Sequence, residues 1–155
     1  MKLKDKKVVV VGFGLTGHAV CDFLLGQQAS IIVSDKKPES ELEKVDLYKA
    51  RGVQFDTGAN RLETLLKAEL IVLSPGVPPL PEVLTAREKG LKVISEIELA
   101  YPYLQGKLIG VTGSNGKSTT TTLICKILKK AGFKVHLTGN IGRPLISFVN
   151  KVKPG

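Results

Sequence analysis

Short apolar runs alternate with helical patterns through the first two thirds of the chain. Runs rich in β-branched residues predict strands at residues 7–12, 30–34, 53–57, 68–73 and 91–95. Between them, apolar residues at helical spacing predict helices at residues 16–27, 42–51, 61–67 and 81–89. Strands that alternate with helices indicate an α/β fold, in which helices cover both faces of a parallel sheet.

The pattern begins again after residues 96–105, which form a helix or a connector. It predicts a strand at 107–112, a helix from residue 117, a strand at 133–137 and a helix at 142–150. So short a unit buries too little surface to stand alone, and we expect it to lean on the first domain, on a partner or on further sequence. We therefore expect an N-terminal piece of a longer protein, with a first domain at 1–98, a linker at 99–106 and the beginning of a second domain at 107–155.

The most informative motif opens the second unit and reads Thr112-Gly-Ser-Asn-Gly-Lys-Ser-Thr119. A strand, a glycine turn and a helix start gather backbone N–H groups at one point, where the helix dipole also favours an anion. The Lys117 ammonium would serve the β- and γ-phosphates of a nucleoside triphosphate, and the Ser118 hydroxyl would face Mg²⁺. The usual first glycine is displaced by one place, to Gly110. A glycine-rich hairpin is the alternative, and it leaves the lysine and hydroxyls unexplained.

A second glycine turn, Gly12-Phe-Gly-Leu-Thr-Gly17, follows the first strand and opens the first helix. It fits G-x-G-x-x-G, and Asp35 lies 18 residues beyond Gly17 at the end of the second strand. Glycines at these positions permit a tight turn, close approach of a diphosphate and helix packing, while the acid can accept hydrogen bonds from a sugar or base. The motif predicts a nucleotide diphosphate without saying which, and a turn kept for packing alone is the other interpretation.

Two further loops follow predicted strands. Ser74-Pro-Gly76 ends the strand at 68–73, and Gly139-Asn-Ile-Gly-Arg-Pro144 follows the strand at 133–137. Ligands of open parallel sheets bind at the carboxyl edge of the strands, so Ser74–Gly76 is expected to share one crevice with Gly12–Gly17 and Asp35–Lys37. A rigid proline loop and a simple helix start are the respective alternatives.

The net charge of +9 is carried entirely by the last third of the chain. Residues 1–105 hold 14 basic and 14 acidic side chains, whereas residues 106–155 hold nine basic and no acidic ones. Nucleic-acid binding is one explanation, but no aromatic platform accompanies the lysines, and anionic phosphates explain them better. Because no carboxylate follows Glu98, the acid that usually helps hold Mg²⁺ must come from the first half or from sequence further on.

The composition is that of a globular protein, with 43% hydrophobic and 24% charged residues. No apolar run approaches the roughly 18 residues of a membrane span. We expect a cytoplasmic protein in which Cys21 and Cys125 are reduced, buried thiols.

These motifs together resemble the Mur ligases over the whole chain. The resemblance is carried by Val11–Gly17, Asp35, Ser74–Gly76, Glu96-Ile-Glu-Leu99, Thr112–Thr119 and Gly139–Gly142. It implies a Rossmann-like first domain for the UDP of the substrate, then the start of a P-loop-type α/β domain for ATP and Mg²⁺. Leu-Thr-Gly17 with Ser-Pro-Gly76 indicates the branch that joins D-glutamate to UDP-N-acetylmuramoyl-L-alanine through an acyl phosphate, in a monomeric enzyme of peptidoglycan synthesis.

The resemblance also implies roles for individual residues. The UDP part of the substrate would contact Gly14, Leu15, Thr16, Gly17, Asp35, Lys36, Lys37, Ser74, Pro75 and Gly76. The ATP phosphates would be held by Gly113, Ser114, Asn115, Gly116, Lys117, Ser118 and Thr119, with Ser118 on Mg²⁺. Lys117 and Asn140 would serve the reaction itself. The other catalytic residues of the family lie beyond residue 155, so we expect residues 1–155 alone to form no amide bond.

An NAD-dependent oxidoreductase or an NAD-sensing Rossmann domain is the main alternative, because it explains Gly12–Gly17 and Asp35 equally well. That alternative does not explain the glycine-rich loop at Gly113–Thr119.

Overall fold

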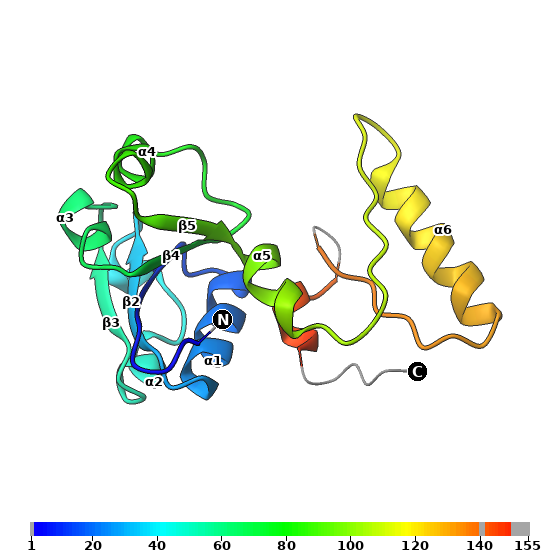
Figure 1. Cartoon of the computed structure of the whole chain (residues 1–155), viewed down its shortest axis with the longest axis horizontal. Coiled ribbons are helices and arrows are strands. Elements are labelled where there is room, and N and C mark those ends of the chain that lie inside the picture. Colours follow the sequence, from blue (N-terminus) through cyan, green and yellow to red (C-terminus); the bar gives the residue numbers. More distant parts are fainter. Residues whose placement is uncertain (1, 140–141, 150–155) are drawn as a thin grey trace.

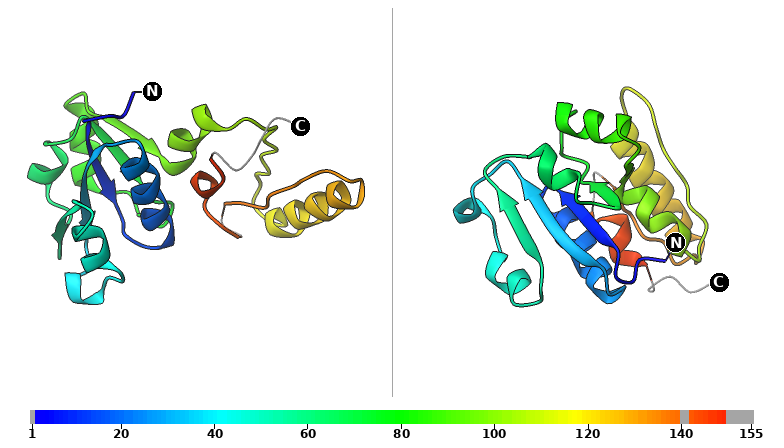
Figure 2. Two further views of the ribbon diagram at one scale, coloured as in Figure 1. Left: turned by 90° about the horizontal axis from the view of Figure 1, so that it is seen from below. Right: turned by 60° about the vertical axis from the view of Figure 1, so that its left-hand side comes forward.

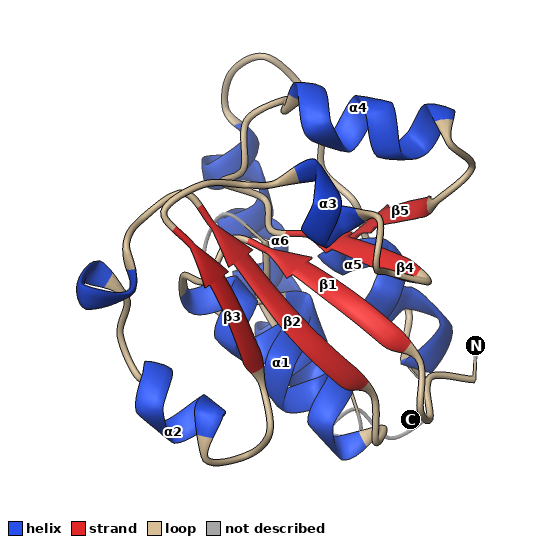
Figure 3. Cartoon of the chain, turned by 90° about the vertical axis from the view of Figure 1, so that its left-hand side faces the viewer, coloured by secondary structure: helices blue, strands red, loops and turns tan. Residues whose placement is uncertain are grey.

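A five-stranded parallel sheet organises the first 100 residues. The computed structural model describes residues 2–139 and 142–149. The strands are β1 (Lys7–Val11), β2 (Ser30–Asp35), β3 (Gln54–Thr57), β4 (Leu70–Leu73) and β5 (Lys92–Ser95), in the order β3-β2-β1-β4-β5. All neighbouring strands are parallel, with Val9 of β1 opposite Ile32 on one side and Ile71 on the other (Figure 3). The predicted α/β fold with a parallel sheet is confirmed.

Helices cover both faces of this sheet. They are α1 (Leu15–Gly26), α2 (Val45–Lys49), α3 (Leu62–Leu65), α4 (Pro81–Glu88) and α5 (Glu96–Ala100), with 3₁₀ turns η1 (Glu39–Glu41) and η2 (Tyr101–Tyr103). Because side chains alternate along β1, Val8 and Val10 join the core beneath α1, while Val9 and Val11 join a second core beneath α3 and α4 (Figures 1 and 3). The side chains of β1 are therefore buried on both faces of the sheet.

The helix predicted at 42–51 is much shorter in the structure. Only Val45–Lys49 is helical, and Lys44 just before it adopts a left-handed φ of 62°. Burial of Val45 and Tyr48 against the core determines this segment more strongly than its helical spacing does.

The second unit contains the predicted helix but not the predicted strands. Helix α6 spans Lys117–Lys130, yet residues 107–112 and 133–137 are irregular, and a single bridge pairs Thr138 with Arg143. A strand requires a neighbour for its backbone hydrogen bonds, and in the described part of the chain these two segments have none. Their side chains consequently remain open to solvent, with Ile109 58% and Phe133 63% exposed.

The segment after the bridge packs on the first domain. We expected a helix at 142–150; residue 150 lies outside the described residues, and the rest forms only a 3₁₀ turn, η3 (Leu145–Phe148). Leu145, Ile146 and Val149 are buried in the same core as α1, because their apolar side chains leave water and η3 packs against α1 and α5. Figure 2 shows η3 between the sheet domain and α6.

Two glutamates follow β5, of which one caps α5 and the other binds the η3 segment. Glu98 completes a capping box, in which its carboxylate accepts the Ser95 N–H and its own N–H donates to Ser95 Oγ. Glu96 is only 3% exposed, and its carboxylate accepts the N–H of Ile146 at 2.6 Å. Burial raises the pKa of Glu96, partly offset by the backbone hydrogen bonds from Ile146 and Leu145.

Two other expectations concern burial and membranes. Cys21 and Cys125 are free and buried, as predicted, and burial raises the pKa of the Cys21 thiol to about 12. None of the helices in the described residues is long and apolar enough to cross a bilayer.

We expect Glu96→Gln to leave the chain at least as stable at pH 7 and to flatten its pH dependence. The raised pKa means that folding favours the protonated acid, so native stability falls as pH rises from the ordinary glutamate value through the folded one. Glutamine keeps the acceptor oxygen without the buried charge. Urea unfolding between pH 4.5 and 8 measures the effect.

Glu96→Ala is the contrasting variant. It leaves the N–H of Ile146 buried without an acceptor, which costs about 1–3 kcal/mol. Equal stability of the alanine and glutamine variants would show that the carboxylate does not hold η3.

Candidate binding site at the carboxyl edge of the sheet

A cavity of about 340 Å³ opens at the carboxyl ends of β1, β2 and β4. It is lined by the ten residues predicted for the substrate, Gly14, Leu15, Thr16, Gly17, Asp35, Lys36, Lys37, Ser74, Pro75 and Gly76. It is also lined by Gly12, Phe13, Asn60, Val77, Pro78 and Leu80. The three predicted segments thus meet in one crevice, as the topology of a parallel sheet requires.

The three glycines of the first turn have different physical roles. Gly12 has a φ of 90°, and an added Cβ would come within 2.8 Å of a Val77 methyl group. A Cβ on Gly17 would lie 2.2 Å from the Gly12 carbonyl oxygen, so α1 can pack against the turn only with glycine there. A Cβ on Gly14 would meet nothing within 4 Å, so the backbone there borders open space in the cavity.

The start of α1 is suited to an anion. Gly14 is its N-cap and supplies no side-chain hydrogen bond, so the first N–H groups of the helix have no capping side chain. These groups and the helix dipole lie at the cavity, and the exposed lysines 36 and 37 add positive charge at its rim. Leu15 is 69% exposed there, an apolar side chain available to a ligand.

Asp35 connects two walls of the cavity. One carboxylate oxygen accepts the N–H of Phe13 at 2.7 Å, and the other accepts the N–H of Lys37 at 2.9 Å. Sequence reasoning assigned this acid to the ligand. The structure adds that it fixes the glycine turn against the loop after β2, so it also shapes the site.

Ser74 links the loop after β4 to the first glycine turn. Its hydroxyl donates to the Gly12 carbonyl oxygen at 2.9 Å, and its own carbonyl accepts the N–H of Val77 at 3.1 Å. The loop through Pro75 and Gly76 is thereby held beside the first glycine turn.

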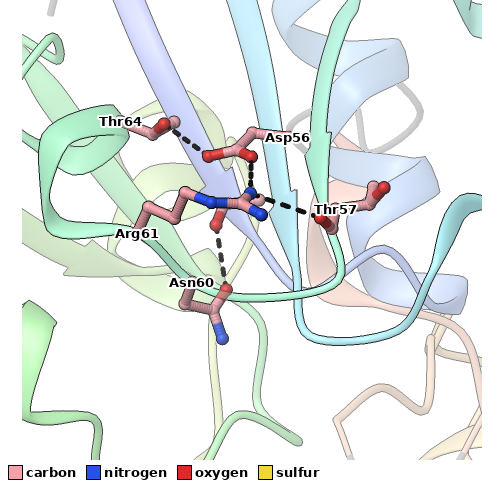
Figure 4. Close-up of polar contacts among 6 residues, drawn as sticks. Asp56, Thr57, Asn60, Arg61 and Thr64 are labelled. Carbon is pink, nitrogen blue, oxygen red and sulfur yellow. Dashed lines mark hydrogen bonds and ion pairs between the residues drawn. The ribbon is translucent and has the colours of Figure 1, made fainter.

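Asn60 is the polar residue of the cavity that sequence reasoning missed. It lies after β3, and its side-chain oxygen accepts a hydrogen bond from Ser34 Oγ at 2.9 Å. Figure 4 shows the surrounding loop, in which Asp56 accepts hydrogen bonds from Arg61 and Thr64. The sequence offered one signal for Asn60, its position just after a predicted strand of the parallel sheet. That strand, β3, is short and is followed by no glycine motif, so the signal was weak.

The predicted triphosphate loop lies outside this cavity. Gly113, Ser114, Asn115, Gly116, Lys117, Ser118 and Thr119 are all exposed at the start of α6, away from the sheet (Figure 1). The φ of Gly116 is 75°, and α6 has no side-chain cap. The Lys117 ammonium donates to the carbonyl oxygens of Gly113 and Ser114, within the loop itself. Asn140, the other residue predicted for the reaction, lies outside the described residues.

Comparison with protein families agrees with this arrangement. The model of the Mur ligase MurD-like N-terminal domain matches residues 6–95, and that of the Mur ligase middle domain matches residues 111–152. The chain belongs to the Mur ligase family.

Two curated relatives of this Mur ligase chain have the same name. Each is a UDP-N-acetylmuramoylalanine–D-glutamate ligase, and they come from Desulfatibacillum aliphaticivorans and Pelobacter propionicus. They are 45% identical over 96% of the chain and 42% identical over 99% of it. The chain spans about a third of their length, 33% and 35% respectively.

Solved structures show the same fold. A pseudomurein peptide ligase type C from Methanothermus fervidus matches 93% of the chain and 31% of its own, with a TM-score of 0.57 and 30% identity. UDP-N-acetylmuramate–alanine ligase from Thermotoga maritima matches 82% of the chain and 30% of its own, with a TM-score of 0.53 and 21% identity. The latter likeness concerns the fold alone.

We expect Gly17→Ala to disrupt the cavity of this Mur ligase chain and Gly14→Ala to leave the fold intact. The new methyl at position 17 collides with the Gly12 carbonyl, at a cost of about 1–3 kcal/mol. At position 14 the φ is −85° and the space is open. Thermal unfolding compares the two variants, and equal loss of stability would contradict this assignment of the glycines.

Proposed function

We propose that the chain is the substrate-binding and nucleotide-binding portion of an ATP-dependent ligase that joins D-glutamate to UDP-N-acetylmuramoyl-L-alanine. The observation that carries the proposal is the single cavity lined by all ten residues expected to meet UDP. The names of relatives more than 40% identical over nearly the whole chain support it. The amide product would be a precursor of peptidoglycan.

The two parts of the chain have different proposed roles. We assign the UDP part of the substrate to residues 1–98, a linker to 99–106 and the start of the ATP-binding domain to 107–155. The matched ranges 6–95 and 111–152, with a gap between them, support this division. The proposed substrates and buried free thiols suit a cytoplasmic enzyme, and we propose that it acts as a monomer.

In the cavity, the uncapped N–H groups at Leu15, Thr16 and Gly17 would bind the diphosphate, with Lys36 and Lys37 adding charge. Close approach is possible at Gly14, where the backbone borders open space. The uridine would lie toward the loops after β2 and β4, where Asp35, Ser74, Pro75 and Gly76 line the wall. The apolar side chains of Val77 and Leu80 line the wall on the β4 side of the cavity.

The loop at Gly113–Thr119 would hold the phosphates of ATP. Three features suit this loop to phosphate oxygens: α6 begins without a capping side chain, Gly116 is left-handed, and a lysine occupies the first helical position. The Lys117 ammonium would exchange the carbonyl oxygens of Gly113 and Ser114 for phosphate oxygens. Ser118 would face Mg²⁺, and Asn140 would lie near the reacting end of the substrate. ATP supplies the phosphoryl group that turns a substrate carboxylate into an acyl phosphate with a good leaving group.

Titration of the chain with UDP-N-acetylmuramoyl-L-alanine and with NADH tests the assignment of the cavity. We expect the uridine nucleotide to bind and NADH to bind at least about tenfold more weakly, because the proposal assigns the wall beside the diphosphate position to uridine, which NADH lacks. Isothermal titration calorimetry gives both constants. Tighter binding of NADH would replace this proposal with the oxidoreductase interpretation.

Lys117→Ala is expected to weaken ATP binding by the whole ligase by about 10- to 100-fold, because a charge aimed at the phosphates is lost. Lys129→Ala, in the last turn of α6, is the matched control and should change nothing. ADP release in the presence of D-glutamate and UDP-N-acetylmuramoyl-L-alanine measures both. Unchanged kinetics in Lys117→Ala would remove the loop from the ATP site.

A further inference from the structure

Asn60 offers a fixed pair of hydrogen-bond donors to the cavity. Its side-chain oxygen is occupied by the hydroxyl of Ser34, which is fully buried on β2. Since that bond uses the carbonyl end of the amide, the Nδ2 end is left with two N–H groups. Figure 4 shows this nitrogen on the side opposite the bond, and within the described residues it has no protein partner.

The backbone around Asn60 is held by its own polar contacts. Asp56 accepts hydrogen bonds from Arg61 and from the buried Thr64, and Arg61 also donates to the Thr57 carbonyl at 3.3 Å. These contacts span the loop from the end of β3 to the start of α3 (Figure 4). The amide is therefore positioned before any ligand arrives, which limits the entropy lost on binding.

The place of Asn60 in the sheet decides which part of a ligand it meets. The diphosphate position lies where β1 meets α1, whereas Asn60 follows β3 and its amide is held by Ser34 of β2, in the order β3-β2-β1. The amide therefore lies one to two strand spacings, about 5–10 Å, to the β2 side of the diphosphate position, within reach of the far edge of a pyrimidine base whose phosphates bind at α1. That edge of uracil carries the O4 carbonyl, an acceptor, whereas cytosine has an amino donor there.

We propose that Asn60 Nδ2 donates a hydrogen bond to O4 of the uracil ring and so makes the cavity select uracil over cytosine. Ser34 acts as a positioning residue that keeps the amide oxygen away from the base. This inference rests on the proposed function, in which the cavity holds a uridine diphosphate. A cytosine in the same place would set its amino group against the Asn60 N–H groups and leave both sets of donors unpaired.

Calorimetric titration of the full chain with UDP and with CDP tests the proposal. We expect the unaltered chain to prefer UDP by about tenfold or more. Asn60→Asp puts an acceptor where the donor was, so UDP binding should fall by about tenfold and the preference should vanish or reverse. Gln54→Glu, an exposed site at the other end of β3, adds the same charge and should leave the ratio unchanged.

Two further variants keep the test decisive if Asn60→Asp folds poorly. Asn60→Ala removes the donors without adding charge and should bring the UDP-to-CDP ratio close to one. Ser34→Ala frees the amide to rotate and should lower the ratio with a smaller loss of UDP affinity, an effect that general loosening of the loop would not produce.

The outcomes separate the two proposals. If the unaltered chain binds neither nucleotide, the assignment of the cavity to a uridine diphosphate fails and this inference fails with it. If it binds UDP but does not discriminate against CDP, or if the Asn60 variants keep the original ratio, the inference alone is wrong.

Discussion

The backbone of Gly12 holds the candidate site together. Its N–H donates to the Ser34 carbonyl at 2.9 Å, and its own carbonyl accepts the Ser74 hydroxyl at 2.9 Å. Gly17 lies so close to that carbonyl that no side chain fits between them. Three strands and one helix therefore meet at one residue, and the crevice above it follows from how closely their backbones approach.

Carboxylates extend this arrangement by joining loops to one another. Asp35 uses both oxygens to connect the N–H groups of Phe13 and Lys37. Glu96, buried behind the sheet edge, accepts the N–H of Ile146 and holds a segment 50 residues further along the chain. Each acid satisfies backbone donors that the regular hydrogen bonds of strands and helices leave free.

The second unit shows what happens where such neighbours are missing. Helix α6 forms because its hydrogen bonds are internal, whereas the apolar segments on either side lack a partner strand in the described residues. The apolar side chains of Ile109, Ile127 and Phe133 remain more than half exposed. The apolar side chains at η3 are buried instead, because they pack into the core of the first domain.

The sequence by itself determined the α/β class, the strands of the first sheet, α6 and the ten predicted residues of the cavity. These depend on local spacing, on glycines at strand ends and on the rule that parallel strands present their carboxyl ends along one edge. It did not reveal Asn60, the hydrogen bonds by which Asp35 joins two loops, or the docking of Leu145–Phe148 on the first domain. Those features depend on contacts between segments far apart in the chain, as in the bond from Ser34 to Asn60, which no local pattern encodes. Tertiary structure alone decided which apolar segments became strands, because a strand exists only beside another one.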